Sequence, residues 1–128
     1  MYINLDEEVP QPQLPAGVAI RTARTSQDDR DIHGLVQAAF DWRERVEQSF
    51  EDWQSFMMRP DVYDETLWFL AEKDATIIGA CLATSYSDLG WIRQLAVKKE
   101  FRKLGIGQAL LQIAFREFKS RGFPKAGL

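Results

Sequence analysis

Two glycines in a basic stretch mark the strongest candidate site of this chain. The stretch runs from Trp91 to Leu111 and places Gly105 and Gly107 at the expected start of a helix. A helix N-terminus presents unpaired backbone N–H groups and the positive end of the helix dipole, so it stabilises an anion without a side chain. Glycine has no Cβ, which lets the chain turn tightly and a phosphate oxygen approach the amides. The pattern predicts a receptor for a phosphate-containing ligand.

Basic residues are concentrated just before this helix, although the whole chain carries a net charge of −3. The negative balance argues against a nucleic-acid-binding protein that works through bulk electrostatics. A charge run taken alone is typical of a solvated surface, but its place beside a glycine-bearing helix start favours phosphate binding. The local cations are Arg93, Lys98, Lys99, Arg102 and Lys103.

Composition limits the other kinds of site that the chain can hold. Its 128 residues are 45% hydrophobic, which suits one domain with one core. The single cysteine, Cys81, excludes an intrachain disulfide, and the single histidine, His33, excludes a zinc cluster of the usual composition. We therefore expect no metal and a reducing, cytoplasmic setting. We expect no membrane association, because no apolar run approaches the roughly 20 residues of a membrane span and the N-terminus is acidic.

The elements before the glycine stretch are predicted from periodicity and turn residues. Residues 1–17 are acidic and proline-rich, which predicts an extended linker. A strand is expected from Val18 to Ala23, then a helix capped by Thr25 or Ser26. A second helix is expected between a cap at Ser49 and a stop at Pro60. The buried stripe of the first helix is predicted to be Ile32, Leu35, Val36, Ala39 and Phe40.

The second half of the chain reads as a hairpin followed by the glycine stretch. Residues 67–72 and 77–84 are predicted to be antiparallel strands, with Cys81 as a core residue of the second. After the strand at Trp91 and the helix start, Gly122 and Pro124 predict the helix end, and residues 125–128 begin another strand. His33 is interpreted as a structural helix-surface residue. The charged connector 41–48 is either the border of a substrate groove or a surface loop.

The order of these elements, together with Arg102-x-x-Gly105-x-Gly107, resembles the GNAT acetyltransferase superfamily. The resemblance covers about Val18 to Leu128, and residues 1–17 look like the joint between two such domains of a tandem protein. It implies an α/β (α+β) fold with a mixed, mainly antiparallel sheet flanked by helices. The implied order is β-α-α-β-β-β-α-(β), truncated at the start of the fifth strand and without the C-terminal strands.

The resemblance also implies acetyl-CoA as co-substrate and an amine as acceptor. In the family the pantetheine arm pairs with the strand that corresponds to Leu95, Ala96 and Val97. The pyrophosphate would be held by amides from Lys103 through Gln108, with added charge from the basic connector. The predicted cofactor-binding residues are Leu95, Ala96, Val97, Arg102, Lys103, Leu104, Gly105, Ile106, Gly107 and Gln108.

The catalytic residues do not follow from the resemblance. Some members of the family place a glutamate base where this chain has Arg93, and an arginine cannot be the base. The usual acid is a tyrosine on a helix after the fifth strand, and the sequence ends before that helix. We therefore predict an N-acetyltransferase acting on a small-molecule or peptide amine, without naming a catalytic residue.

Two alternatives stand beside this prediction. The chain could be a non-catalytic CoA-binding or interaction domain, or an inactive fragment of such an enzyme, which Arg93 and the missing acid favour. A nucleotide-phosphate binder is disfavoured because the glycines lack the Gly-Lys-Ser/Thr ending of a P-loop. If the C-terminal strands are absent, the strand at Trp91 should have an unpaired edge. That edge predicts a homodimer formed through it.

Overall fold

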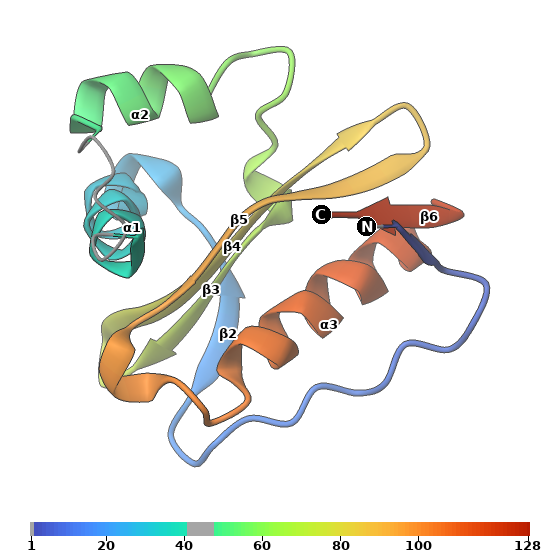
Figure 1. The fold of residues 1–128 in the computed structure, drawn as a ribbon, viewed down its shortest axis with the longest axis horizontal. Helices are drawn as coiled ribbons and strands as arrows, with labels where there is room; N and C mark the ends of the chain where they lie inside the picture. The colour runs from blue at the N-terminus through green and yellow to red at the C-terminus, as the bar shows by residue number, and fades with distance from the viewer. Residues whose placement is uncertain (1, 41–47) are drawn as a thin grey trace.

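A six-stranded sheet lies between helices on its two faces in the computed structural model, which describes residues 2–40 and 48–128. The strand order is β1-β6-β5-β4-β3-β2, and every neighbouring pair is antiparallel except β5 and β6. Helices α1 and α2 lie on one face and α3 on the other (Figure 1). The elements are β1 Tyr2–Asn4, β2 Ala19–Thr22, α1 Thr25–Phe40, α2 Phe50–Met57, η2 Glu65–Leu67, β3 Trp68–Lys73, β4 Thr76–Tyr86, β5 Leu89–Val97, η3 Lys99–Phe101, α3 Ile106–Ser120 and β6 Lys125–Gly127. The predicted fold class is confirmed.

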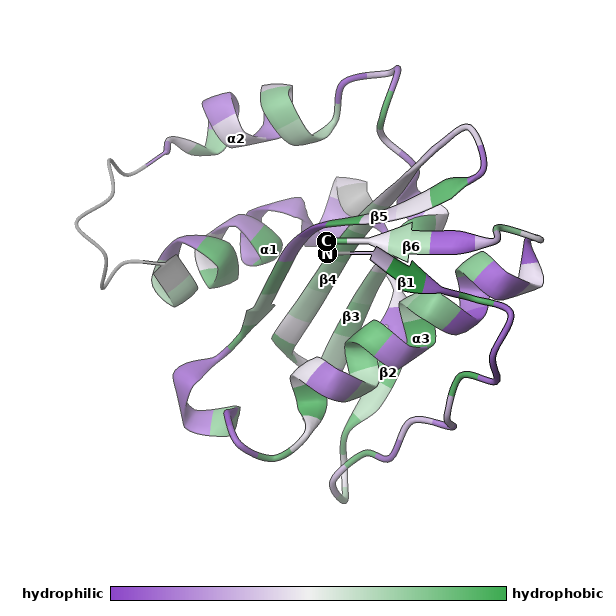
Figure 2. Ribbon diagram, turned by 45° about the vertical axis from the view of Figure 1, so that its right-hand side comes forward, coloured by the Kyte–Doolittle hydropathy of each residue, from purple (hydrophilic) through white to green (hydrophobic). Residues whose placement is uncertain are grey.

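The central strands are buried on both faces because helices cover both. In β3, Trp68 and Leu70 pack under α1 and α2, whereas Phe69 and Ala71 pack under α3. Two core layers result, one on each side of the sheet, and Figure 2 shows the apolar stripe of α3 turned toward the strands. This double cover explains why four consecutive residues of β3 are all buried and why the strand does not alternate with polar residues.

The predicted hairpin is confirmed as β3 and β4. The connection is a two-residue turn at Asp74 and Ala75, whose φ angles of 50° and 62° are both positive. Positive φ at both central residues is typical of the turn whose twist matches that of the flanking strands. The strands therefore extend one residue further into the joint, to Lys73 and from Thr76, than the sequence predicts.

Of the two predicted helix caps, one is found in the structure and the other is not. Ser49 caps α2 as predicted, because its hydroxyl oxygen accepts the N–H of Asp52 at 3.1 Å. Helix α1 begins at Thr25 itself, and the carboxylate of Asp28 accepts the N–H of Arg24 at 2.8 Å. Asp28 reaches back in this way because the guanidinium of Arg21 on β2 holds it with two further bonds of 2.8 and 3.0 Å.

Within the described ranges, no helix combines the length and apolar character needed to cross a membrane.

The N-terminal segment packs on the rest of the domain, so the prediction of an unpacked linker is wrong for residues 2–9. β1 pairs antiparallel with β6, and Leu5 is a buried member of the core under α3. The segment then runs along α3, where the carbonyls of Glu7 and Val9 accept bonds from side chains of that helix. A three-residue strand is too short to show an alternating pattern. The domain boundary at residue 18 stays a prediction.

The edge of β5 at Trp91 is paired, which corrects the prediction of an open edge there. β6 runs parallel to β5 over Leu89–Trp91, and β1 covers the far side of β6. Gly127 permits the close approach, because a Cβ there would lie 2.5 Å from the Trp91 ring. Within the sheet, β5 has no partner on this side along the part that follows Trp91 among the described residues.

Helix α3 is fixed against the sheet by glycines on the strands. A Cβ at Gly90 of β5 would lie 2.4 Å from the ring of Phe118, and one at Gly79 of β4 would lie 3.1 Å from Leu110. The helix ends as predicted, with Gly122 at φ 86° and the N–H of Phe123 bonded to the carbonyl of Phe118. This close packing sets where the N-terminus of α3 lies relative to β5.

Candidate cofactor site

The second half of β5 presents free backbone groups at the open side of the sheet. The Lys98 N–H donates to the Ile78 carbonyl at 2.8 Å, and the register continues with Ala96 opposite Ala80. Hydrogen-bonded and non-hydrogen-bonded pairs alternate in an antiparallel ladder, so the N–H and C=O groups of Leu95 and Val97 point away from β4. No strand in the described part of the chain pairs with them on that side. They suit a ligand that binds as an added strand.

The three strand residues predicted to bind the cofactor therefore differ from one another. The backbone groups of Leu95 and Val97 point away from β4. Those of Ala96 pair with Ala80 of β4, and its side chain is buried and faces α1. The carbonyl of Val97 already accepts a bond of 3.0 Å from Arg102 Nε. Arg102 is thereby held at the end of the strand, next to the predicted path of the cofactor.

The N-terminus of α3 is uncapped and open. Gly105 is the N-cap residue with φ 82°, which favours glycine, and no side chain caps the helix. The first bond of the helix runs from the Ala109 N–H to the Gly105 carbonyl at 2.9 Å. The N–H groups of residues 106–108 therefore have no carbonyl one turn earlier within the helix. These amides lie where the sequence predicts an anion receptor.

Gly107 has no structural reason of its own to be glycine. Its φ is not positive, and a Cβ there would make only an ordinary contact of 3.7 Å with Val97. A Cβ at Gly105 would meet nothing within 4 Å. The space beside both glycines is therefore free, and a phosphate group fits the residues present. The packing of the protein itself leaves Gly107 unexplained, and close approach of a ligand explains it.

The remaining predicted residues surround these amides in different ways. Lys103 and Leu104 are exposed, and Lys103 has a positive φ of 66° in the loop before Gly105. The side chain of Ile106 is buried in the core, so only its N–H faces outward. Gln108 borders a hollow of about 370 Å³ together with residues of the N-terminal segment. That contribution, from Pro10, Gln11 and Gln13, has no signal in the sequence.

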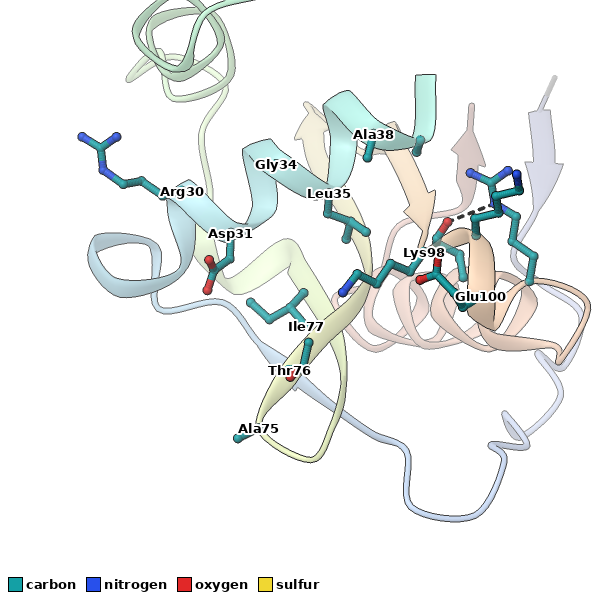
Figure 3. Close-up of a pocket in the computed structure, with 14 residues that line it drawn as sticks. Arg30, Asp31, Gly34, Leu35, Ala38, Ala75, Thr76, Ile77, Lys98 and Glu100 are labelled. Carbon is teal, nitrogen blue, oxygen red and sulfur yellow. Dashed lines mark hydrogen bonds between the residues drawn. The ribbon is translucent and has the colours of Figure 1, made fainter. Parts of the chain in front are cut away.

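A second hollow of about 650 Å³ adjoins the basic connector on the α1 side (Figure 3). Its walls come from α1, from the β3–β4 turn and from the connector after β5. Lys98 reaches from the connector into this cleft, and Arg102 is another of its lining residues. Cations outnumber acids along the walls, which favours an anion. The charged lining residues are Arg30, Asp31, Lys98, Lys99, Glu100 and Arg102.

β5 contains a bulge at Arg93. Gln94 lies opposite Leu82 and Ile92 opposite Ala83, so Arg93 is an extra residue without a partner in β4. A bulge reverses the alternation of side chains, and here it directs both Arg93 and Gln94 to the face of α2. Two adjacent polar residues in an otherwise apolar strand were a sequence signal for the bulge. Arg93 was identified from the sequence as a residue of interest, whereas Gln94 was not.

Contacts with α2 hold both side chains. Arg93 Nη1 donates to the Met57 carbonyl at 3.1 Å, and its guanidinium lies 5.1 Å from the Phe56 ring centre. Gln94 Oε1 accepts the Trp53 indole N–H at 3.1 Å. Burial lowers the pKa of Arg93 from its usual value, although a guanidinium remains protonated in a protein. The predicted position of the catalytic base thus holds a cation.

The lone cysteine and histidine have structural roles, as predicted. Cys81 is fully buried, and burial raises the pKa of its thiol to about 12, so it is no nucleophile. His33 Nε2 lies 2.8 Å from the Gln48 carbonyl, and its ring packs against Phe50 and Trp53. Of the charged connector 41–48 that could border a substrate groove, residues 41–47 lie outside the described residues.

A model of the acetyltransferase (GNAT) family matches residues 27–128. The chain belongs to this family. Mycothiol acetyltransferase from Streptomyces coelicolor is 28% identical over 132 residues, covering 94% of this chain and 40% of that protein. A solved GCN5-related N-acetyltransferase from Sphaerobacter thermophilus is 33% identical with a TM-score of 0.88, covering 98% of this chain and 39% of that chain.

A third match shows the fold alone. N-acetylglutamate synthase from Neisseria gonorrhoeae, solved with coenzyme A and N-acetyl-glutamate, is 22% identical with a TM-score of 0.65. It covers 85% of this chain and 24% of that chain. The GNAT chain described here thus spans well under half the length of the relatives that it matches.

Proposed function

We propose that this GNAT domain binds acetyl-CoA and transfers its acetyl group to an amine of a small molecule or peptide. One juxtaposition carries the proposal: the unpaired N–H and C=O of Leu95 and the N–H of Val97 lie on a strand whose end, at Val97, is beside Gly107 at the uncapped start of α3. A linear ligand with an amide-bearing arm and a pyrophosphate would satisfy both. Membership of the family supports the same co-substrate.

Each part of the site has a distinct task in holding the co-substrate. Leu95 and Val97 would pair with the amides of the pantetheine arm. The N–H groups of Gly105 through Gln108 would bind the pyrophosphate, and the cations of the connector would neutralise part of its charge. When bound, acetyl-CoA supplies the acetyl group as a thioester. Of the three predicted strand residues, the proposal keeps Leu95 and Val97 as ligands of the co-substrate and makes Ala96 a spacer that sets their separation.

The reaction requires proton movements that the described side chains do not yet explain. The acceptor nitrogen forms a bond to the acetyl carbon while the carbon–sulfur bond breaks, the ammonium loses protons, and the thiolate gains one. Arg93 cannot accept a proton at the position where some relatives have a glutamate. This observation favours the second candidate, a domain that binds CoA without catalysis.

Two measurements test these candidates in turn. Calorimetry with acetyl-CoA and with CoA should give saturable binding at one site per chain, and a lack of binding would overturn both candidates. Thiol release from acetyl-CoA should then be followed over a panel of amines. Steady release above the rate without amine rejects the non-catalytic candidate, and its absence over the whole panel rejects the enzyme.

The setting and assembly of the protein belong to the same proposal. A free buried thiol at Cys81 suits a reducing compartment, and we propose the cytoplasm. The predicted homodimer would now use the outer edge of β1, because β6 and β1 cover β5 at Trp91. Tyr2 on that edge is 67% exposed. Light scattering at two protein concentrations decides between a monomer and this dimer.

A further inference from the structure

The bulge at Arg93 lies where the reactive end of the co-substrate should be. From the start of α3, the proposed contacts run back along β5 to Val97 and then to Leu95. Residues two apart in a strand are separated by about 6.6 Å, so a further step of that length leads to Arg93. This inference rests on the proposed function, because it takes the direction of the bound co-substrate from it.

Arg93 has more hydrogen-bonding capacity than the protein uses. A guanidinium has five N–H donors, and the bond to the Met57 carbonyl takes one of them. No carboxylate forms an ion pair with Arg93 among residues 2–40 and 48–128. The side chain is half-buried, and burial lowers its pKa. A cation that is short of both water and a counterion favours binding of an anion.

Gln94 adds a second donor beside it. The indole N–H of Trp53 can only donate, so the atom of Gln94 that faces it must be the amide oxygen. The amide NH2 group of Gln94 is then turned away from Trp53. Because the bulge places both side chains on one face, the guanidinium and this NH2 group lie on the same side of the strand.

The neighbouring surface is suited to an organic acid. Phe56 is 52% exposed and lies beside the Arg93 guanidinium, and Tyr86 is 45% exposed at the end of β4. A second cation, Arg59, also lies near Phe56 at 5.8 Å from the ring centre. Arg59 differs from Arg93 because it has its own carboxylate, Asp61, at 3.8 Å. Asp61 acts on Arg93 only from beyond ion-pair distance, so Arg93 is the one of these two cations without a carboxylate in direct contact.

We propose that Arg93 and Gln94 bind a carboxylate of the acceptor, so that the acceptor is an amine that also carries an acid group, such as an amino acid. A planar guanidinium matches a carboxylate with two parallel bonds. Arg93 thus selects the acceptor and does not act as a base. In this proposal, the position where some members of the family place a glutamate serves recognition of the acceptor.

The test measures binding of products, so it does not depend on turnover. The chain is saturated with CoA, and calorimetry compares several N-acetylated amino acids with their carboxamides, beginning with N-acetyl-leucine and N-acetyl-leucinamide. We expect the acids to bind about tenfold or more tightly, the effect of a charge-assisted pair. Absence of an acid preference across the panel overturns the proposal.

Three variants locate the preference. Arg93→Met should bring acid and amide within about twofold of each other, while CoA affinity and melting temperature stay close to those of the unmodified chain. Gln94→Glu keeps an acceptor for the Trp53 N–H but replaces the NH2 group by an oxygen. The carboxamides of the N-acetylated amino acids should then bind more tightly than the acids. Arg59→Met is the matched control and should keep the preference. A preference that survives Arg93→Met overturns the proposal.

Failure of this inference can be told apart from failure of the proposed function. Loss of CoA binding would reject the function before any product is tested. If CoA binds and neutral amines release thiol, but acids have no advantage, only the role of Arg93 is rejected. If amino acids are substrates, Arg93→Met should raise KM for them by about tenfold and change kcat little.

Discussion

The two sites on β5 are built from different parts of the chain. From Leu95 to Gln108 the groups aimed outward are backbone N–H and C=O, set by strand register and by an uncapped helix. At Arg93 and Gln94 the groups are side chains, directed by a bulge and held by α2. A backbone site tolerates changes of side chain as long as glycine stays at the helix start. A side-chain site changes its ligand with one substitution, so co-substrate and acceptor can diverge independently.

Gly107→Asp should have the largest effect, and it should weaken the proposed cofactor site without affecting the proposed acceptor site. Its Cβ has room, and an aspartate in the first helical turn is favoured by the helix dipole, so stability should be unchanged or higher. The carboxylate would occupy the anion receptor and repel the pyrophosphate. We expect acetyl-CoA affinity to fall by about 100-fold or more, measured by calorimetry.

The matched control for this substitution is Ser120→Asp, which adds the same charge at the far end of α3. It should change acetyl-CoA affinity by less than about threefold, because an exposed charge roughly 20 Å away along the helix is screened. Equal losses in both variants would show that net charge, and not the amides beside Gly107, governs binding. The cofactor site would then not be a backbone site, and its contrast with the acceptor site would be lost.

Asp28→Asn tests whether the packing of α1, on the same face of the sheet as the proposed acceptor site, can be destabilised without loss of acetyl-CoA affinity. Asp28 is 6% exposed and joins the start of α1 to Arg21 on β2. Removing its charge leaves Arg21 partly unpaired, which should cost about 2 kcal/mol in the free energy of unfolding. Acetyl-CoA affinity of the folded variant should stay within about twofold.

The loss in Asp28→Asn should depend on pH in a fixed direction. Hydrogen bonds from the Arg21 guanidinium lower the pKa of Asp28, so its contribution is present above the ordinary pKa of about 4 and disappears as pH falls through the lowered value. Urea unfolding at pH 7 and at pH 3 should therefore show a smaller gap between the two proteins at pH 3. Asp31→Asn, on the exposed side of α1, should show no such gap at either pH.

The sequence predicts the elements of the proposed cofactor site, from Leu95 to Gln108, because their signals are local. Gly105 has a positive φ that favours glycine, and Gly107 follows it at a fixed spacing although its own backbone and packing do not require glycine. The strands followed from apolar runs, and the hairpin from its short polar joint. These signals lie within a few residues of one another, so one sequence was sufficient to find them.

The side-chain half was not predictable because its contacts are distant in sequence. Trp53 and Gln94 are 41 residues apart, and Arg93 meets Met57 across 36 residues. β1 was missed for the same reason, since its partner β6 lies at the other end of the chain. Periodicity identifies elements, but it does not say which side chains of different elements meet. The bulge was the one part of this half with a local sign, the polar pair at Arg93 and Gln94.

Trp53→Phe should affect the acceptor half and leave the cofactor half intact. The substitution removes the only donor to Gln94 Oε1 among the described residues and shortens a fully buried side chain. We expect a loss of about 1–2 kcal/mol in the free energy of unfolding. The preference for acids over amides should fall by about twofold to fivefold, because Gln94 is free to rotate, while acetyl-CoA affinity is unchanged. A loss of acetyl-CoA affinity would show that the two halves are coupled.

Arg102 should give the smallest effect, because two consequences of removing it oppose each other. Its Nε bond occupies the Val97 carbonyl, so Arg102→Met frees that acceptor for the co-substrate but removes a charge near the pyrophosphate. Arg102 is exposed, and exposed charges contribute less than about 1 kcal/mol, so acetyl-CoA affinity should fall only about threefold. The loss should shrink in high salt, and Arg102→Lys, which keeps the charge, should bind within about twofold of the unmodified chain. A loss as large as that of Gly107→Asp would mean that a side chain holds the phosphates. The cofactor site would then depend on side chains as the acceptor site does.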